Sequence, residues 1–134
     1  MVLLDRVLEA ADSCILTELT VRDDGLFSDR HTVPAWVGME YMAQAVAAYS
    51  GYQRRRQGRQ IELGFLLGTR LYQCSAPQFD CGSILRVGAE KVVESSNDMA
   101  VFDCFIEGEQ ITASAKLNVF LPRDSRQFLA GKGL

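Results

Sequence analysis

The sequence predicts an α+β fold in which one long helix is wrapped by a curved antiparallel sheet. One segment, from Pro34 to about Gln57, has apolar and small residues at helical spacing. The rest of the chain alternates between apolar and polar residues in short runs bounded by turn residues, which is typical of strands. Because 134 residues is the usual size of one domain, we expect a single domain over residues 1–134.

Six strand-like runs surround the predicted helix. The first two are joined by the turn residues Ala11–Ser13 and form a predicted hairpin. The turns at 95–98 and 108–109 are short enough to require antiparallel pairing of the strands that they join. The runs are Leu3–Ala10, Cys14–Val21, Ile61–Cys74, Ser83–Glu94, Ala100–Glu107 and Gln110–Leu121.

The predicted helix begins at Pro34, because proline at the first helical position gives up a donor that has no helical partner. Arg54–Arg56 place positive charge at its carboxyl end, where it complements the helix dipole. Small residues lie on several faces, so we expect a helix that is buried on most sides. The side chains that recur at spacings of three and four are Trp36, Met39, Ala43, Val46, Ala47 and Ser50.

The last predicted strand has one apolar and one polar face, which indicates a sheet that packs against the helix on one side. The inward set is Ile111, Ala113, Ala115, Leu117 and Val119. Long edge strands expose unpaired backbone groups, so we expect an edge to pair with a second copy of the chain or with a homologue.

Composition argues against several classes of protein. A net charge of −3 does not favour binding to nucleic acid. The apolar part of the helix is too short to span a membrane. Met1–Arg6 lacks the pattern of a signal peptide, so a cytoplasmic location is expected. Strand-like sequence starts there at once, which leaves open a natural segment ahead of it.

Metal and cofactor sites have no support in the sequence. The four cysteines lie far apart, with no Cys-x-x-Cys pair and no nearby histidine, which favours free thiols over a zinc site or a disulfide. No glycine-rich phosphate loop is present. We therefore expect no metal and no bound cofactor.

Glu40 is the strongest catalytic candidate. It lies in the predicted helix with Met39, Met42 and Ala43 around it on the helical wheel. Burial favours the protonated form of a carboxyl group, and such a group serves as a general acid near neutral pH. The alternative is that Glu40 faces solvent or a polar interface.

Two further side chains are candidates beside Glu40. His31 is the only histidine, and histidine is the usual general base at neutral pH. It could meet Glu40 across a dimer more easily than within one chain; the alternative is an exposed loop histidine. Gln44, one turn after Glu40, either orients that carboxyl group or satisfies its own amide at an interface.

The start of the helix and its basic end predict substrate contacts. Backbone N–H groups of Ala35 or Trp36, with the positive end of the helix dipole, are suited to hold a thioester carbonyl oxygen. Arg54–Arg56 and Arg59, joined by Arg70, form a basic group that would dock an acidic carrier protein. The alternative is a solvated helix end.

Three segments, Leu3–Val7, Pro34–Ala45 and Leu66–Arg70, together resemble the FabZ-like 3-hydroxyacyl-acyl carrier protein dehydratases of the hotdog superfamily. The subgroup associated with aryl polyene biosynthesis is the most similar. The resemblance implies a hotdog fold and a substrate carried on the phosphopantetheine of acyl carrier protein. It also implies that a histidine removes the α-proton while a helix carboxylic acid protonates the departing hydroxyl, giving a trans-2-enoyl thioester.

Glu40 matches the acid of that family, whose two catalytic groups usually come from different subunits. The family loop reads Gly-His-Phe-Pro-Gly-x-Pro-x-x-Pro-Gly, whereas here only Thr32 and Val33 separate His31 from Pro34. We hypothesise that the histidine comes from a paralogous hotdog subunit in a heterodimer; a homodimer is the alternative. Two other functions stay open, an acyl thioesterase and a non-catalytic hotdog partner.

Overall fold

The computed structural model describes residues 3–23, 30–56, 65–95 and 97–120, with one helix and eight strands. The helix α1 is Val37–Arg56, and the strands are β1 (Arg6–Ala10), β2 (Cys14–Thr20), β3 (Thr32–Pro34), β4 (Phe65–Cys74), β5 (Gln78–Asp80), β6 (Ile84–Glu94), β7 (Met99–Glu107) and β8 (Thr112–Phe120).

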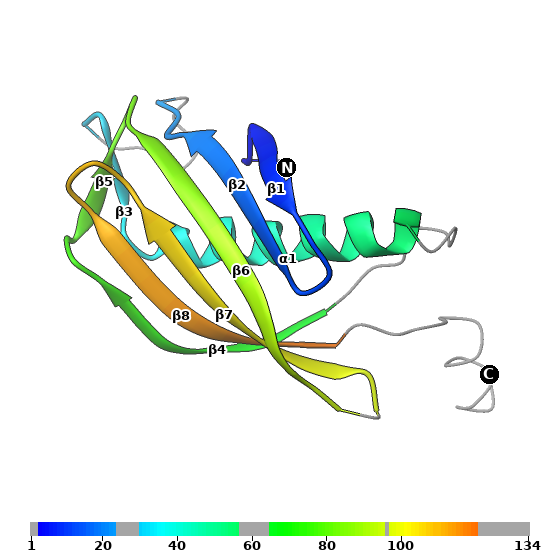
Figure 1. Cartoon of the computed structure of the whole chain (residues 1–134). Helices are drawn as coiled ribbons and strands as arrows, with labels where there is room; N and C mark the ends of the chain where they lie inside the picture. Colours follow the sequence, from blue (N-terminus) through cyan, green and yellow to red (C-terminus); the bar gives the residue numbers. More distant parts are fainter. Residues whose placement is uncertain (1–2, 24–29, 57–64, 96, 121–134) are drawn as a thin grey trace, which may run out of the picture.

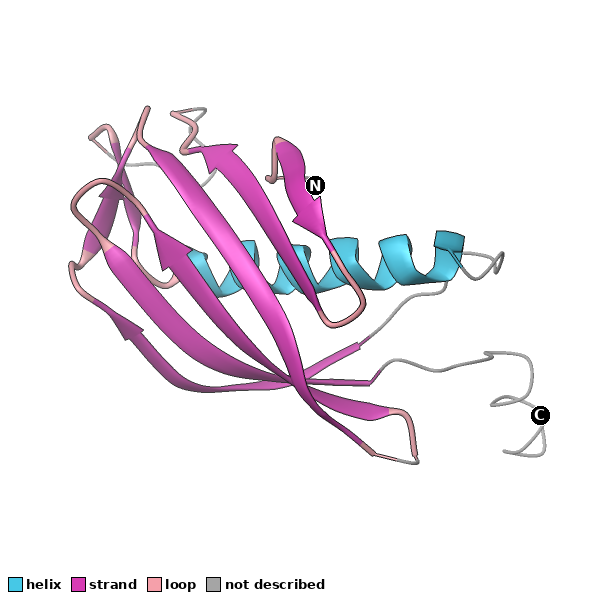
Figure 2. Ribbon diagram, viewed as in Figure 1, coloured by secondary structure: helices cyan, strands magenta, loops and turns pink. Residues whose placement is uncertain are grey.

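The strands form one large and one small sheet. Six strands make an antiparallel sheet in the order β1-β2-β6-β7-β8-β4, and β3 pairs with β5 beside it. The large sheet curves around α1 (Figure 1), which lies along its hollow side (Figure 2). The predicted helix wrapped by an antiparallel sheet is therefore confirmed. The predicted boundaries at Gln57, Ile61 and Leu121 lie outside the described residues.

The small sheet corrects the predicted start of the helix. Pro34 is the last residue of β3, where it pairs with Gln78, and α1 begins only at Val37. Val33 and its partner Phe79 are both buried, so the pairing adds to the core. The fixed φ of proline suits an extended edge residue as well as a first helical turn, and here the pairing with a distant segment decides.

The buried face of α1 also differs from the prediction. Of the helix residues that recur at spacings of three and four, only Val46 and Ser50 are buried, whereas Trp36 and Ala47 are exposed. A helix that is apolar or small on most sides carries little information about its rotation, so the bulkiest side chains decide which face packs on the sheet. The buried residues are Val37, Gly38, Tyr41, Met42, Ala45, Val46, Tyr49, Ser50 and Arg54.

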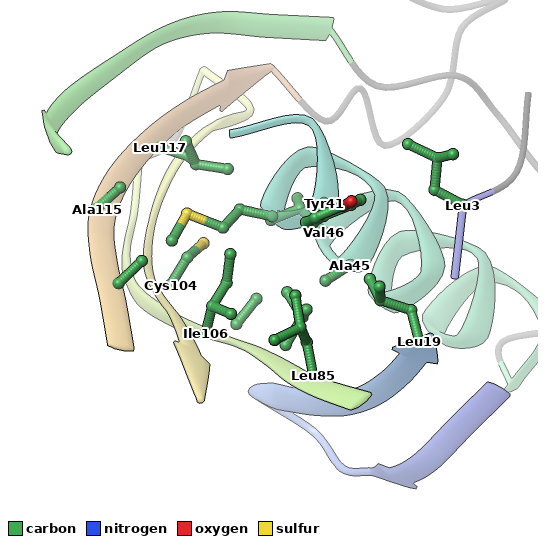
Figure 3. Close-up of a cluster of buried hydrophobic side chains, with 14 of the residues drawn as sticks. Leu3, Leu19, Tyr41, Ala45, Val46, Leu85, Cys104, Ile106, Ala115 and Leu117 are labelled. Carbon is green, nitrogen blue, oxygen red and sulfur yellow. The ribbon is translucent and has the colours of Figure 1, made fainter. Parts of the chain in front are cut away.

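The core fills the space between α1 and the hollow face of the sheet (Figure 3). The Tyr49 ring meets Phe102 edge to face, with 5.4 Å between the ring centroids. The Cys104 thiol is free and buried in this core, and burial raises its pKa to about 12. The predicted inward face of the last strand is confirmed for Ala113, Ala115, Leu117 and Val119, which are all buried. Ile111, the fifth predicted member, precedes β8 and is only half-buried against the core.

We predict that Phe102→Ala lowers the free energy of unfolding by about 3–5 kcal/mol, because a fully buried ring leaves a cavity. Urea denaturation followed by circular dichroism measures the change. Phe105→Ala, three residues along the same strand and 38% exposed, is the matched control. It should cost clearly less, and equal losses in the two variants would contradict this account of the core.

Candidate active site

Glu40 lies in the first turn of α1 and is exposed in the single chain. The expected burial of its carboxyl group is therefore wrong. Tyr41, Met42 and Tyr49 pack on the sheet, and Glu40 points from the opposite side of the helix. An acidic side chain in the first turn is stabilised by the positive end of the helix dipole, so the position suits a carboxylate without a buried partner.

Gln44 connects Glu40 to the segment before β1. The Leu3 backbone N–H donates to Gln44 Oε1 at 2.7 Å, and Gln44 Nε2 donates to Glu40 Oε1 at 3.1 Å. The Leu3 donor fixes which end of the amide is oxygen, so the nitrogen has to face the carboxyl group. Of the two roles predicted for Gln44, the structure supports orientation of Glu40.

This contact also distinguishes the two carboxyl oxygens of Glu40. Because Oε1 accepts a hydrogen bond from the amide, the protonated form of Glu40 carries its proton on Oε2. A proton on Oε2 is available for transfer to a substrate oxygen. Gln44 is thus placed to set both the direction of the carboxyl group and the atom that donates.

His31 is not brought to Glu40. Its backbone has φ of 65°, its side chain is 87% exposed, and Nδ1 lies 2.5 Å from an oxygen of Asp23. No hydrogen bond joins His31 to Glu40 within the described residues. The three residues of β3, which together span about 10 Å, separate His31 from the turn before the helix. The alternative of an exposed loop histidine describes this chain.

The predicted backbone donor at the helix start is partly corrected. The N–H of Ala35 donates to the Pro77 carbonyl at 2.9 Å, so it is not available to a thioester. Trp36 is in the same turn, one helical turn before Glu40, and its side chain is 56% exposed. Trp36 therefore lies at the surface, four residues before Glu40.

Within the described residues, Arg54 and Arg70 do not join the predicted docking surface. Arg54 is buried, and Arg56 forms an ion pair with Asp12 at 2.5 Å. Arg70 reaches Asn118 Oδ1 at 3.4 Å on the outer face of the sheet, away from α1. That position excludes Arg70 from the surroundings of Glu40, and the predicted contribution of Arg59 lies outside the described residues.

A groove of about 780 Å³ starts at Gln44 and runs between β1 and the second half of α1. This groove was not predicted from the sequence. The sequence signal for the groove is its small residues at helical spacing: Ala47 is exposed, and Ala48 and Gly51 are half-buried. The groove is lined by Leu4, Asp5, Arg6, Val7, Ala10, Gln44, Ala47, Ala48, Gly51, Tyr52 and Arg55. Apolar room is therefore present next to the Glu40–Gln44 pair.

Among the described residues, no three His, Cys, Asp or Glu side chains are grouped so that they could hold a metal ion. Within the same segments, no helix has the length and apolar character that crossing a bilayer requires.

One helix in a curved antiparallel sheet defines a hotdog-fold protein, and solved structures agree. The dehydratase heterocomplex ApeI:P from Xenorhabdus doucetiae is 27% identical, with a TM-score of 0.82 over 96% of this chain and 88% of that chain. The phenylacetic acid degradation protein PaaI from Thermus thermophilus is 19% identical, with a TM-score of 0.66 over 87% and 92%. Thioesterase superfamily member 2 from Mus musculus is 11% identical, with a TM-score of 0.65 over 87% and 81%.

The last two similarities show the fold alone. The family is established by a match of the sequence to a family model. The family model ApeP-like, described as ApeP dehydratase, matches residues 1–130. The chain therefore belongs to the ApeP-like dehydratase family. This confirms the resemblance to the dehydratases associated with aryl polyene biosynthesis. A comparison with curated proteins gives no match.

We predict that Gln44→Ala speeds hydrogen exchange of the Leu3 amide roughly fivefold to tenfold, as expected when one neutral hydrogen bond is lost. Exchange measured by NMR gives the rate. Gln53→Ala is the matched control, because Gln53 donates to the Ala11 carbonyl at 2.7 Å near the other end of α1. Unchanged exchange of Leu3 in Gln44→Ala would rule out the Gln44 bridge.

Proposed function

We propose that this chain supplies the acid of a dehydratase that converts 3-hydroxyacyl thioesters on acyl carrier protein into trans-2-enoyl thioesters, working with a second hotdog subunit. The observation that carries the proposal is the outward-facing Glu40 carboxyl group in the first turn of α1, held by Gln44. Membership in the ApeP-like dehydratase family supports the reaction class.

The reaction needs two proton transfers. A base removes the proton from C2 of the acyl group, and Glu40 gives its Oε2 proton to the hydroxyl on C3. The C3–O bond breaks, water leaves, and the electron pair from C2 forms the C2–C3 double bond. Glu40 thus acts as the general acid, and its carboxylate remains after the proton has been given up.

The substrate would lie across the exposed face of α1. Trp36, which is exposed four residues before Glu40, would form a wall for the thioester end. The groove that starts at Gln44 offers apolar room for the acyl chain beyond the reacting carbons. In this proposal the acyl group arrives on the phosphopantetheine arm of acyl carrier protein, and side chains supply proton transfer without a metal or bound cofactor.

A partner subunit would complete the site. β4 lies at one edge of the large sheet and pairs with β8 on its other side, and Leu71 on this edge is 68% exposed. A long edge strand favours pairing with another chain. The similar ApeI:P structure is a heterocomplex. Because His31 faces Asp23 and not the acid, the partner is the proposed source of the base.

We predict that Glu40→Gln lowers dehydration by the mixed complex about 10²-fold to 10⁴-fold, because glutamine keeps the shape and cannot give up a proton. Ultraviolet absorbance of the enoyl thioester measures the rate. Glu107→Gln, at an exposed end of β7, is the control and should keep full activity.

The same assay decides between the alternatives. Full activity of the complex with Glu40→Gln would make this chain a non-catalytic partner. Release of free carrier thiol from a saturated acyl thioester, with no enoyl product, would identify a thioesterase instead.

We predict that the pure protein is inactive, that a complex with a paralogous hotdog subunit is active, and that His31→Ala leaves this complex within about threefold of wild type. The physical reason is that His31 is exposed and paired with Asp23. Steady-state rates of the three samples, measured on one 3-hydroxyacyl carrier protein, provide the test. Turnover by the pure protein that His31→Ala abolishes would overturn the assignment of the base to a partner.

A further inference from the structure

One phenol ties the start of α1 to the edge strand β4. The Tyr72 hydroxyl donates a hydrogen bond to the carbonyl of Ala35, and the same carbonyl accepts the Gly38 N–H at 3.0 Å. Burial raises the pKa of Tyr72 well above its usual value, so the hydroxyl keeps its proton and remains a donor. Tyr72 therefore holds the turn from which the helix starts, a role that the sequence did not suggest.

Gly38 makes this contact possible. A Cβ at Gly38 would collide with the Tyr72 hydroxyl and would lie 3.1 Å from Ile106 and 3.2 Å from Phe79. Glycine is unfavourable inside a helix because it loses more conformational freedom than other residues on folding. The chain nevertheless has glycine here, at the point where the phenol packs against the first turn.

Strand β4 breaks its alternation to turn Tyr72 inward. Arg70 faces outward, so strict alternation would place Leu71 inside and Tyr72 outside. Instead the register with β8 shifts between Arg70 and Gln73, and Leu71 takes φ of 57° with its side chain 68% exposed. This is a β-bulge, and a left-handed conformation is unfavourable for leucine.

Two unfavourable backbone features, Gly38 in the helix and the left-handed Leu71, thus serve the same contact. The glycine in the helix and the left-handed Leu71 both allow the Tyr72 hydroxyl to reach Ala35. Unfavourable backbone conformations persist where the surrounding structure holds them, and they gather at functional sites. Glu40 follows Gly38 by two residues, so the same turn carries the proposed acid.

We propose that Tyr72 is a positioning residue for the dehydration reaction: it fixes the backbone of the Glu40 turn from strand β4, while Gln44 fixes the Glu40 side chain. This inference rests on the proposed function for its catalytic part. Because Tyr72 lies on the edge strand, the position of the acid depends on the conformation of the edge that the proposed partner would cover.

The test is Tyr72→Phe, which keeps the ring and removes the hydrogen bond. In the mixed complex we expect kcat to fall roughly tenfold with KM within about twofold, because the bound substrate meets a displaced acid. Tyr49→Phe is the matched control. The Tyr49 hydroxyl donates to the Asp12 carbonyl at 2.5 Å, so this variant also loses one bond from tyrosine to backbone and should keep kcat.

A second readout does not need activity. Trp36 is the only tryptophan of the chain and follows Ala35 directly, so its fluorescence in the purified full chain reports on the same turn. Acrylamide quenching of Trp36 should increase in Tyr72→Phe and stay at the wild-type level in Tyr49→Phe. Gly38→Ala, which pushes the phenol aside, should also increase quenching. The double variant of Gly38 and Tyr72 should add little to either change, because both remove one contact.

Quenching and kcat together distinguish the possible roles of Tyr72. Altered quenching together with a lower kcat in Tyr72→Phe, and neither in Tyr49→Phe, supports the inference. Altered quenching with unchanged kcat makes Tyr72 a structural residue only, and unaltered quenching removes the link itself; either result overturns the positioning role. If the wild-type complex forms no enoyl product, the proposed function fails. In that case, acrylamide quenching of Trp36 alone tests whether Tyr72 fixes the turn before α1.

Discussion

The packing of the large side chains of α1 against the hollow face of the sheet determines how the rest of the molecule is arranged. Tyr41, Met42 and Tyr49 are buried there, and this sets the rotation of the helix about its axis. The opposite face, with Glu40 and Gln44, then has to point away from the sheet. A carboxyl group on the buried face would need a partner or a proton to offset its loss of water. Core and candidate site are therefore two faces of one helix.

The sheet was predictable from the sequence because alternation with period two is a local property. The inward face of the last strand, from Ala113 to Val119, matches residue by residue. The short strands β3 and β5 were not predictable, since three residues are too few to show a period and their pairing joins distant segments. The rotation of α1 about its axis could not be predicted from the sequence either, because small residues on most sides give little periodic signal.

In the candidate site, too, contacts between residues close in sequence were predictable, and contacts with distant segments were not. Glu40 and Gln44 were correctly placed on one face because helix geometry alone puts residues four apart together. The other candidates depended on partners elsewhere in the chain. The Ala35 N–H is taken by Pro77, and Arg70 faces outward on the sheet. Tyr72 was missed because only the bulge turns it inward.

The bulge at Leu71 has a consequence for which strands this edge accepts. Past the bulge the N–H and C=O groups of β4 are out of step with those before it, so a regular strand cannot satisfy both halves in one register. An irregular edge of this kind resists indiscriminate association with flat strands, including the first step of aggregation. In the proposed complex, the partner strand would need a matching offset. Backbone shape would then contribute to the choice of a neighbour along this edge.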